Sequence, residues 1–394
     1  MTTIYESQVA PEVGTHVLIV GIGAYTHLRG GKKPAQETYG LGQLTSPPVS
    51  AKAMLDWFLA PLKDPAAEHG FRNSTAPLAS VEALIAASDP VVVAAPAGLQ
   101  AARDVELSDA TLDDVTLAFE NWRARLIASP GSTGIFYFCG HGVSTDTQYL
   151  LCQDTLKNAG RPFEKLFSLD STLLHLGKDA DGCHLHFWID ACREGQGDML
   201  LSKSTPDGLR SGSIDRPTVE KSHSVLQATG QGEAAFGKKH DVSRFTSALL
   251  KALSGFSGSK KYGGPWQVDS TELAAAIKEM LRVESEVQGK AQYSTAKESG
   301  IGAAIAHLKG PSKVDLHLDL HPGDLRHQGE ILVQSHDGAT NVVHPCGDGA
   351  YTNVVTRGIY HLRARSTAGA FNESALENEF VEPPLYTYTF KVAP

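Results

Sequence analysis

A histidine and a cysteine each follow directly after a short apolar run, and both residue types can take part in acyl chemistry. His141 lies in the segment Phe138-Cys-Gly-His-Gly142, and Cys192 lies in Ile189-Asp-Ala-Cys-Arg193. A thiolate attacks an acyl carbon, and an imidazole protonates the leaving amine, so the two together suit hydrolysis of an amide bond. We therefore predict a catalytic Cys–His pair, with backbone amides near Gly142 and Cys192 stabilising an oxyanion.

The apolar runs that precede these two residues indicate strands of one parallel sheet. The run at 134–139 is bulky and apolar, and the segment 184–190 combines four apolar residues with His184, His186 and Asp190. We expect both to be strands of the sheet. Because ligands of open parallel sheets bind beyond the carboxyl ends of the strands, we expect both side chains at one crevice. Further strands are expected at 16–22, 91–95, 149–152 and 224–229, and helices at 50–62, 80–87, after the capping box Thr111–Asp114, at 245–253 and at 273–283.

The sequence pattern changes near residue 310. Before that point strands alternate with helices, so residues 15–310 are expected to form an α/β domain with a mostly parallel sheet flanked by helices. After it, apolar and polar residues alternate, which predicts an antiparallel β-sandwich at 311–394. Residues 1–14 are expected to be a polar leader. The segment 193–223 is expected to be a long loop, and loops of that length are usually functional or mobile.

Composition and charge exclude several classes of protein. With 35 Lys and Arg against 44 Asp and Glu, the net charge of −9 supplies no basic face for nucleic acid. No run of 18 apolar residues or secretory signal is present, so we expect neither a membrane span nor export. The five cysteines are an odd number without a C-x-x-C pair, which favours reduced thiols and a cytoplasmic location.

The sequence gives less support to a nucleotide-binding site or a metal site than to the Cys–His pair. Gly21-Ile-Gly23 lacks the third glycine of a dinucleotide fingerprint, and there is no P-loop lysine motif. A metal site would have to use Cys183, His184, His186 and Cys192. Along a strand the two histidines point to one face and Cys183 to the other, so these side chains do not converge. We expect no metal site and no required cofactor.

The segment 15–285 resembles the caspase-like peptidases of bacteria, which are relatives of metacaspases and orthocaspases. The most specific motifs are Tyr137-Phe-Cys-Gly-His-Gly142 and Phe187-Trp-Ile-Asp-Ala-Cys-Arg193. Caspases share the spacing of about 50 residues between the histidine and the cysteine. Supporting similarity is found at 111–122, 228–234 and 244–250. The resemblance implies a caspase–haemoglobinase fold, with Cys192 as nucleophile and His141 as the acid–base residue.

The residue two positions before the cysteine bears on specificity. Metacaspases carry Asp there, caspases carry Gln, and this chain carries Asp190. The resemblance places this carboxylate at the floor of a pocket that favours Arg or Lys before the scissile bond. Cys139 takes the place of a small residue, often serine, two before the histidine. Ser50 stands where metacaspases usually have a second acidic residue, and Glu233 is a candidate for the missing charge. The alternative is that Asp190 only caps a loop.

The loop 193–223 corresponds to the caspase linker that is cut on activation. It offers four basic residues for processing by the enzyme itself or by an upstream protease, namely Lys203, Arg210, Arg216 and Lys221. Because exposed loops attract proteases generally, a mobile surface loop is the alternative.

The resemblance thus implies a cytoplasmic cysteine endopeptidase that acts on proteins or peptides with basic residues. It further suggests a regulated role in stress or antiviral defence, and it allows for calcium, which many metacaspases need. The alternative is a catalytically silent, caspase-shaped scaffold or adaptor that acts through the C-terminal sandwich. The presence of both His141 and Cys192 favours the enzyme.

Overall fold

The computed structural model describes most of the chain. The described residues are 3–9, 11–93, 105–107, 109–144, 147–180, 182–193, 207–209, 222–230, 239–261, 263–300 and 303–393. By their contacts they divide into two units, Met1–Leu250 with Asp269–His307, and Lys251–Val268 with Leu308–Pro394. The second unit therefore combines the residues after 308 with a short earlier segment.

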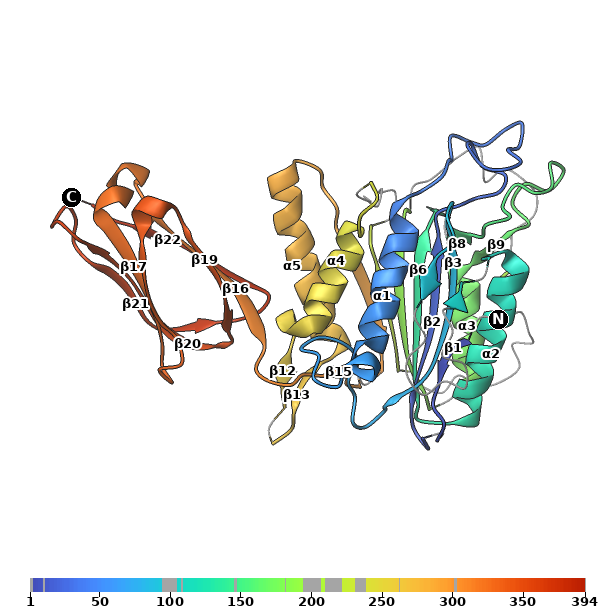
Figure 1. Ribbon diagram of the computed structural model, residues 1–394, viewed down its shortest axis with the longest axis horizontal. Coiled ribbons are helices and arrows are strands. Elements are labelled where there is room, and N and C mark those ends of the chain that lie inside the picture. Colours follow the sequence, from blue (N-terminus) through green and yellow to red (C-terminus); the bar gives the residue numbers. More distant parts are fainter. Residues whose placement is uncertain are drawn as a thin grey trace. The chain divides into compact units, whose positions relative to one another are not determined.

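A seven-stranded sheet forms the centre of the first unit (Figure 1). Its order is β1-β3-β2-β6-β10-β11-β14. The strands are β1 (Thr3–Glu6), β2 (Thr15–Ile22), β3 (Leu78–Ala86), β6 (Thr133–Gly140), β10 (His184–Ala191), β11 (Ser222–Gln227) and β14 (Thr295–Ser299). The five inner strands run parallel, and the two edge strands are antiparallel to their neighbours. All residues of β2 and β6 are buried, which is why these strands read as continuous apolar runs.

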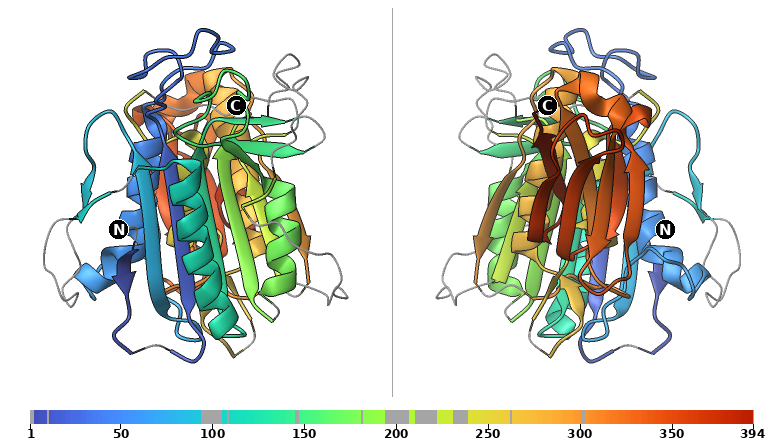
Figure 2. Two further views of the ribbon diagram at one scale, coloured as in Figure 1. Left: turned by 90° about the vertical axis from the view of Figure 1, so that its right-hand side faces the viewer. Right: turned by 90° about the vertical axis from the view of Figure 1, so that its left-hand side faces the viewer.

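Helices cover both faces of this sheet. Figure 1 shows α1, α4 and α5 on one face, and Figure 2 (left) shows α2 and α3 in front of the other. The helices are α1 (Ser46–Lys63), α2 (Leu112–Ala128), α3 (Leu169–Asp179), α4 (Arg244–Lys251) and α5 (Ser270–Gln288). Thr111 is confirmed as the N-cap of α2, since its hydroxyl accepts the N–H of Asp114 at 3.3 Å, which is one of the two bonds of a capping box. The doubly covered parallel sheet is the α/β fold that the sequence predicted.

Several short strands and turns lie outside the main sheet. Strands β7 (Gly142–Ser144), β8 (Gln148–Leu151) and β9 (Leu166–Ser168) form a small antiparallel sheet directly after β6. Strands β4 (Val92–Val93) and β5 (Val105–Glu106) form a two-stranded ribbon. The remaining short strands are β12 (Ser259–Lys260), β13 (Trp266–Val268) and β15 (Ala306–His307), and a wide helical turn spans Ala252–Phe256.

Two sheets of the C-terminal unit share one apolar core. One has the order β19-β16-β22 and the other β18-β17-β20-β21. The strands are β16 (Lys313–His321), β17 (Gly329–Ser335), β18 (Asn341–Pro345), β19 (Tyr351–Thr356), β20 (Gly358–Ser366), β21 (Ser374–Val381) and β22 (Leu385–Lys391), with short 3-10 turns at Gly323–Gln328 and Cys346–Asp348. The expected alternation is clear in β16, whose Val314, Leu316 and Leu318 are all buried. The expected sandwich is confirmed, but β16 and β22 pair in parallel, and the other pairs are antiparallel.

Two segments differ from the sequence interpretation. The helix expected at 80–87 is wrong, because these residues lie in and just after β3, between β1 and β2. Residues 3–6 of the expected leader form the edge strand β1, which pairs with β3.

Candidate active site

The register between β6 and β10 brings the histidine and the cysteine together. In this parallel pair Cys139 lies opposite Asp190, and Gly140 lies opposite Ala191. His141 and Cys192 are the next residue on each strand, so both follow the same edge of the sheet. Residues that lie opposite each other in this pair are 51 apart in sequence, and His141 and Cys192 are separated by the same 51 residues. The spacing of the two motifs therefore follows from the pairing of the two strands.

Two glycines beside His141 allow close backbone approach. A Cβ on Gly142 would lie 2.6 Å from the carbonyl oxygen of Cys192, and one on Gly140 would lie 2.8 Å from the hydroxyl of Tyr25. Both distances are shorter than contacts that a side chain tolerates. The Gly-His-Gly sequence is therefore required for His141 to sit between Tyr25 and the turn that carries Cys192.

Cys192 differs from the other cysteines of the chain in its exposure. The other four, Cys139, Cys152, Cys183 and Cys346, are buried, whereas Cys192 is partly exposed. Burial raises the pKa of Cys139 and Cys152 well above the usual thiol value and raises that of Cys346 to about 11. Because the thiolate is the nucleophile, these three are poorly suited to attack a substrate.

The imidazole of His141 is held from two sides. Its Nε2 lies 2.8 Å from the carbonyl oxygen of Gly42, and its ring centroid lies 5.0 Å from that of Tyr25. Since a carbonyl oxygen can only accept a hydrogen bond, Nε2 carries the proton and Nδ1 keeps its lone pair. Burial lowers the pKa of His141, and the bond to Gly42 acts in the opposite direction. The ring is therefore a neutral base with Nδ1 as its basic nitrogen.

Tyr25 and Gln43 support this histidine, and the sequence analysis missed both. The Tyr25 hydroxyl accepts the backbone N–H of His141 at 2.8 Å. The amide of Gln43 accepts the N–H of Tyr25 at 2.7 Å and donates to its carbonyl at 3.0 Å. Both residues come from the irregular segment after β2, where no periodic pattern marks them. The only available signal was a polar loop of this length directly after a buried strand.

A chain of buried amides supports the backbone of Cys192. Gln148 Nε2 donates to the Cys192 carbonyl at 3.3 Å, and Gln227 Nε2 donates to Gln148 Oε1 at 2.7 Å. Arg193 and Thr295 both donate to Gln227 Oε1, at 3.2 and 3.3 Å. The turn that carries the thiol is thus hydrogen-bonded to β8, β11 and β14.

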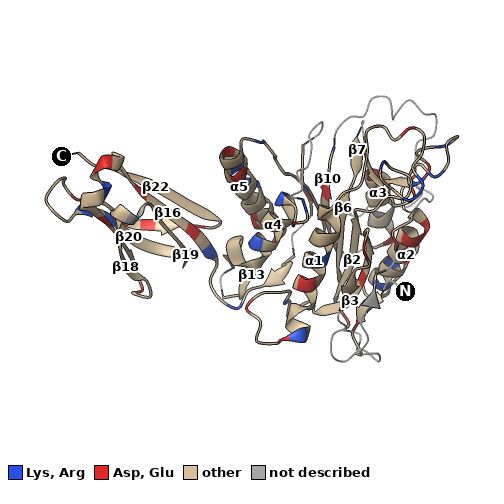
Figure 3. Cartoon of the chain, turned by 45° about the horizontal axis from the view of Figure 1, so that its top comes forward, with Lys and Arg blue, Asp and Glu red and all other residues tan. Residues whose placement is uncertain are grey.

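Asp190 belongs to β10, the strand labelled in Figure 3, and is buried with 4% of its surface exposed. Its Oδ2 accepts from the hydroxyls of Ser243 and Thr246, the latter at 2.6 Å, at the start of α4. Cys139 Sγ donates to the same oxygen at 3.4 Å. Burial raises the pKa of Asp190, and its three hydrogen-bond donors act in the opposite direction.

Three of the expected specificity residues belong to one buried polar cluster. Cys139 contacts Asp190 directly, and Ser50 is joined to it through Ser243, whose N–H donates to the Ser50 hydroxyl at 3.0 Å. Ser50 therefore acts as a hydrogen-bond acceptor for the backbone of Ser243, the residue directly before α4. The remaining candidates, Glu233, Lys203, Arg210, Arg216 and Lys221, lie outside the described residues.

Metal-ligating side chains do not cluster in the described part of the chain. There, no group of three or more His, Cys, Asp or Glu side chains lies close enough together to hold an ion. His186 of the rejected metal set is buried, and its Nδ1 lies 2.7 Å from the Ser224 hydroxyl. Among the described residues, no helix is long and apolar enough to cross a bilayer.

Comparison with known proteins identifies similar chains. The family model described as "Caspase domain" matches residues 16–300. An uncharacterised protein of Sinorhizobium fredii, y4kE, is 30% identical over 291 residues, which cover 70% of this chain and 80% of the relative.

Similar solved structures include caspase-1 from Spodoptera frugiperda, at 11% identity and a TM-score of 0.44. The match covers 78% of this chain and 97% of that caspase. Protein GSU0716 from Geobacter sulfurreducens follows at 14% identity and a TM-score of 0.40, covering 73% and 94% of the two chains.

Proposed function

Because the chain belongs to the caspase-domain family, we propose that it is a cysteine endopeptidase with Cys192 as nucleophile and His141 as acid–base residue. The observation that carries the proposal is the register of β6 and β10, which puts these two residues next to each other at one sheet edge. Cys192 is also the one cysteine of the five that is not buried.

The reaction uses groups already positioned around this pair. His141 Nδ1 accepts the proton of Cys192 Sγ, and the sulfur attacks the substrate carbonyl carbon. The N–H groups of Gly142 and Cys192 stabilise the oxyanion that forms. Nδ1 then passes its proton to the leaving amine, the C–N bond breaks, and water hydrolyses the thioester. Throughout, the bond from Nε2 to the Gly42 carbonyl keeps the ring in orientation.

Substrate selection in this proposal depends on Asp190. Within the described residues, its hydrogen-bond donors all contact Oδ2, which leaves Oδ1 to accept from an arginine or lysine of the substrate. A cation beside this buried carboxyl favours its ionised form and so opposes the pKa rise that burial causes. Cleavage after basic residues is the specificity that follows, with Cys139, Ser50 and Glu233 modifying the pocket.

Control of the enzyme is proposed to act through the segment 193–223. Cleavage at Lys203, Arg210, Arg216 or Lys221, by the enzyme or by an upstream protease, would free the chain next to Cys192. A protease regulated in this way suits a role in stress or antiviral defence.

Peptides ending in Arg, Lys, Asp or Leu before a fluorogenic amine test this function. We expect the wild type to prefer Arg and Lys over Asp by about 100-fold or more, because a buried carboxylate repels an acidic side chain. Cys192→Ala is expected to be inactive, and Asp190→Asn to lose the preference for Arg and Lys. The matched control is Asp56→Asn, on the exposed side of α1. Each protein is assayed with calcium and with a chelator, before and after limited trypsin treatment.

Three outcomes would contradict the proposal. Activity in Cys192→Ala would remove the mechanism, and preferred cleavage after Asp or Leu would remove the role of Asp190. A wild type that stays inactive under all conditions, while remaining folded, would favour the silent scaffold.

A further inference from the structure

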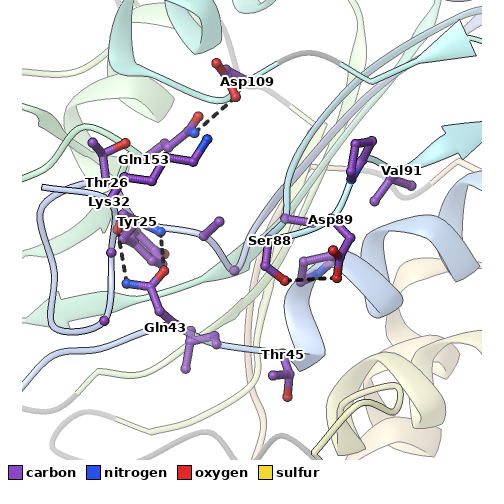
Figure 4. A pocket seen from close by; sticks show the side chains of 18 of the residues that line it. Tyr25, Thr26, Lys32, Gln43, Thr45, Ser88, Asp89, Val91, Asp109 and Gln153 are labelled. Atoms are coloured by element: carbon purple, nitrogen blue, oxygen red, sulfur yellow. Dashed lines mark hydrogen bonds between the residues drawn. The ribbon is translucent and has the colours of Figure 1, made fainter.

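A cavity of about 460 Å³ opens beside the dyad, beyond the carboxyl ends of β2 and β3 (Figure 4). Its walls come from Gly23–Thr26 after β2, from Ala87–Val91 after β3, and from the loop that leads into α1. None of the residues assigned above to catalysis or to the Asp190 cluster lines it. The cavity is therefore a separate binding space at the same edge of the sheet.

Two wall residues connect the cavity to the catalytic histidine. Tyr25 lines the cavity, its hydroxyl accepts the His141 N–H at 2.8 Å, and its ring packs against the imidazole. Gln43 also lines the cavity and directly follows Gly42, whose carbonyl binds His141 Nε2. A ligand in the cavity would therefore contact Tyr25, which binds His141, and Gln43, which adjoins the residue that binds it.

The strand order fixes which part of a substrate lies nearest to the cavity. Along the edge the order is β3, β2, β6, β10, so the cavity comes first, His141 second and Cys192 third. During hydrolysis the leaving amine takes its proton from His141, so the segment after the scissile bond starts on the histidine side. Asp190 itself lies on β10, the last strand in this order, and takes the residue before the scissile bond. Its cluster extends from there to Cys139 on β6, to Ser50 on α1 and to Ser243 and Thr246 at the start of α4.

We propose that this cavity is the subsite for the leaving segment of the substrate, the residues that follow the scissile bond. The inference rests on the proposed peptidase function and adds a requirement to it, namely a peptide that continues beyond the cleavage site. Cleavage would then depend on recognition from both sides of the bond.

The lining chemistry indicates what the leaving segment carries. Apolar atoms come from Leu44, Pro48, Val49 and Val91. The exposed Asp89 and Asp109 lie on separate loops of the wall, Asp109 beside Gln153 and Asp89 beside Ser88 in Figure 4. The exposed Lys32 also lines the cavity, so its charged side chains are two carboxylates and one ammonium. The apolar surface suits a leaving segment with apolar side chains, and the excess of one carboxylate disfavours an acidic one.

Two substrates with the same sequence up to a final arginine test the subsite. One carries only an aminocoumarin after the arginine, and the other continues as Leu-Gly-Leu-Gly with a quencher. We expect kcat/KM to be about tenfold higher or more for the extended peptide, because remote binding energy is used in the transition state. Val49→Trp, at a wall position with 36% exposure, is expected to reduce this ratio to about one. Val287→Trp on the exposed side of α5 is the matched control and should keep the ratio.

A binding measurement makes the test independent of turnover. Fluorescein-labelled Leu-Gly-Leu-Gly is titrated into Cys192→Ala, alone and combined with Val49→Trp, and Asp-Gly-Asp-Gly serves as the acidic comparison. We expect the apolar peptide to bind to Cys192→Ala. Its affinity should be about tenfold lower or more when Val49→Trp is added, and the acidic peptide should bind about tenfold or more weakly than the apolar one.

Equal kcat/KM for the two substrates, or peptide binding that Val49→Trp does not change, would overturn the subsite. If aminocoumarin is released but kcat/KM is no higher for the extended peptide, the subsite is contradicted and the proposed peptidase function stands. If neither substrate is cleaved but the apolar peptide binds as expected, the proposed peptidase function fails and the binding site stands.

Discussion

The hydroxyl of Tyr25 accepts the backbone N–H of His141 at 2.8 Å, and the two rings pack with centroids 5.0 Å apart. Tyr25 follows β2 and His141 follows β6, so this contact joins two neighbouring strand ends above the sheet. It fixes the position of the first residue beyond β6, whose Nδ1 accepts the thiol proton in the proposed mechanism. Tyr25 is therefore a positioning residue for the proposed acid–base group.

Tyr25→Phe is predicted to impair turnover more than folding. The substitution keeps the ring against the imidazole but removes the acceptor of the His141 N–H, and an unsatisfied donor of this kind costs about 1–3 kcal/mol. We expect kcat to fall about tenfold with a small change in KM. Stopped assays with the aminocoumarin substrate measure both constants, and the exposed Tyr293→Phe on the same unit is the control. An unchanged kcat would show that the hydroxyl does not position His141.

Gly142→Ala is predicted to abolish activity. The added Cβ would lie 2.6 Å from the Cys192 carbonyl oxygen and 3.0 Å from Ala191 Cβ, so the two turns must move apart. We expect kcat/KM to fall about 100-fold or more, since a displacement of about 1 Å has effects of that size. Gly310→Ala is the control, because a Cβ there meets nothing within 4 Å. Wild-type kinetics in Gly142→Ala would mean that His141 and Cys192 do not need this close approach.

The pH dependence of kcat/KM is predicted to show an acid limb below pH 6.5. Burial lowers the pKa of His141 below its usual 6.5. The neutral imidazole therefore persists to lower pH, and activity is lost only as pH falls through this lowered pKa and Nδ1 becomes protonated. Initial rates between pH 4 and 8 at subsaturating substrate measure the limb. A midpoint above 6.5 would contradict a buried, neutral His141.

Arg125→Ala is predicted to destabilise the first unit strongly. Arg125 Nη1 lies 2.7 Å from Oε1 of Glu82, which is fully buried on β3. Removing the cation leaves a buried carboxylate without its counter-ion, which costs about 3–5 kcal/mol, although the Thr3 hydroxyl still donates to Oε1 at 3.1 Å. Urea unfolding measures the change, and Glu82→Gln added to Arg125→Ala should recover part of it. The surface variant Arg282→Ala, whose pairs with Glu279 and Glu286 are exposed, should unfold like the wild type.

The same Glu82 explains why a helix was expected at 80–87. The segment Ser80–Ala87 contains Glu, Leu and three alanines, all good helix formers, and its glutamate looks like a solvent-facing residue. In the fold this carboxylate is neutralised by Arg125, 43 residues away on α2. A pairing over that distance leaves no local pattern, so tertiary structure overrides the helix propensity.

The strand ends that carry His141 and Cys192 were predictable for the opposite reason. β6 and β10 are buried along nearly their whole length, so each appears as a mainly apolar segment of strand length, and His141 and Cys192 follow directly after them. Tyr25, Gln43 and the edge strand β14 were not predicted, because each is defined by a partner far along the chain. Gln43, for example, contacts Tyr25 across an irregular loop with no periodicity.

The dyad is tested most directly by labelling the intact protein with a peptidyl-arginine acyloxymethyl ketone, which alkylates activated thiols, and mapping the adduct by mass spectrometry. We expect one adduct on Cys192 and none on the four buried cysteines, and no labelling of Cys192→Ala. In His141→Ala the labelling rate should fall by about 100-fold or more. Labelling of another cysteine, or equal labelling rates in His141→Ala and the wild type, would contradict the proposed Cys–His pair.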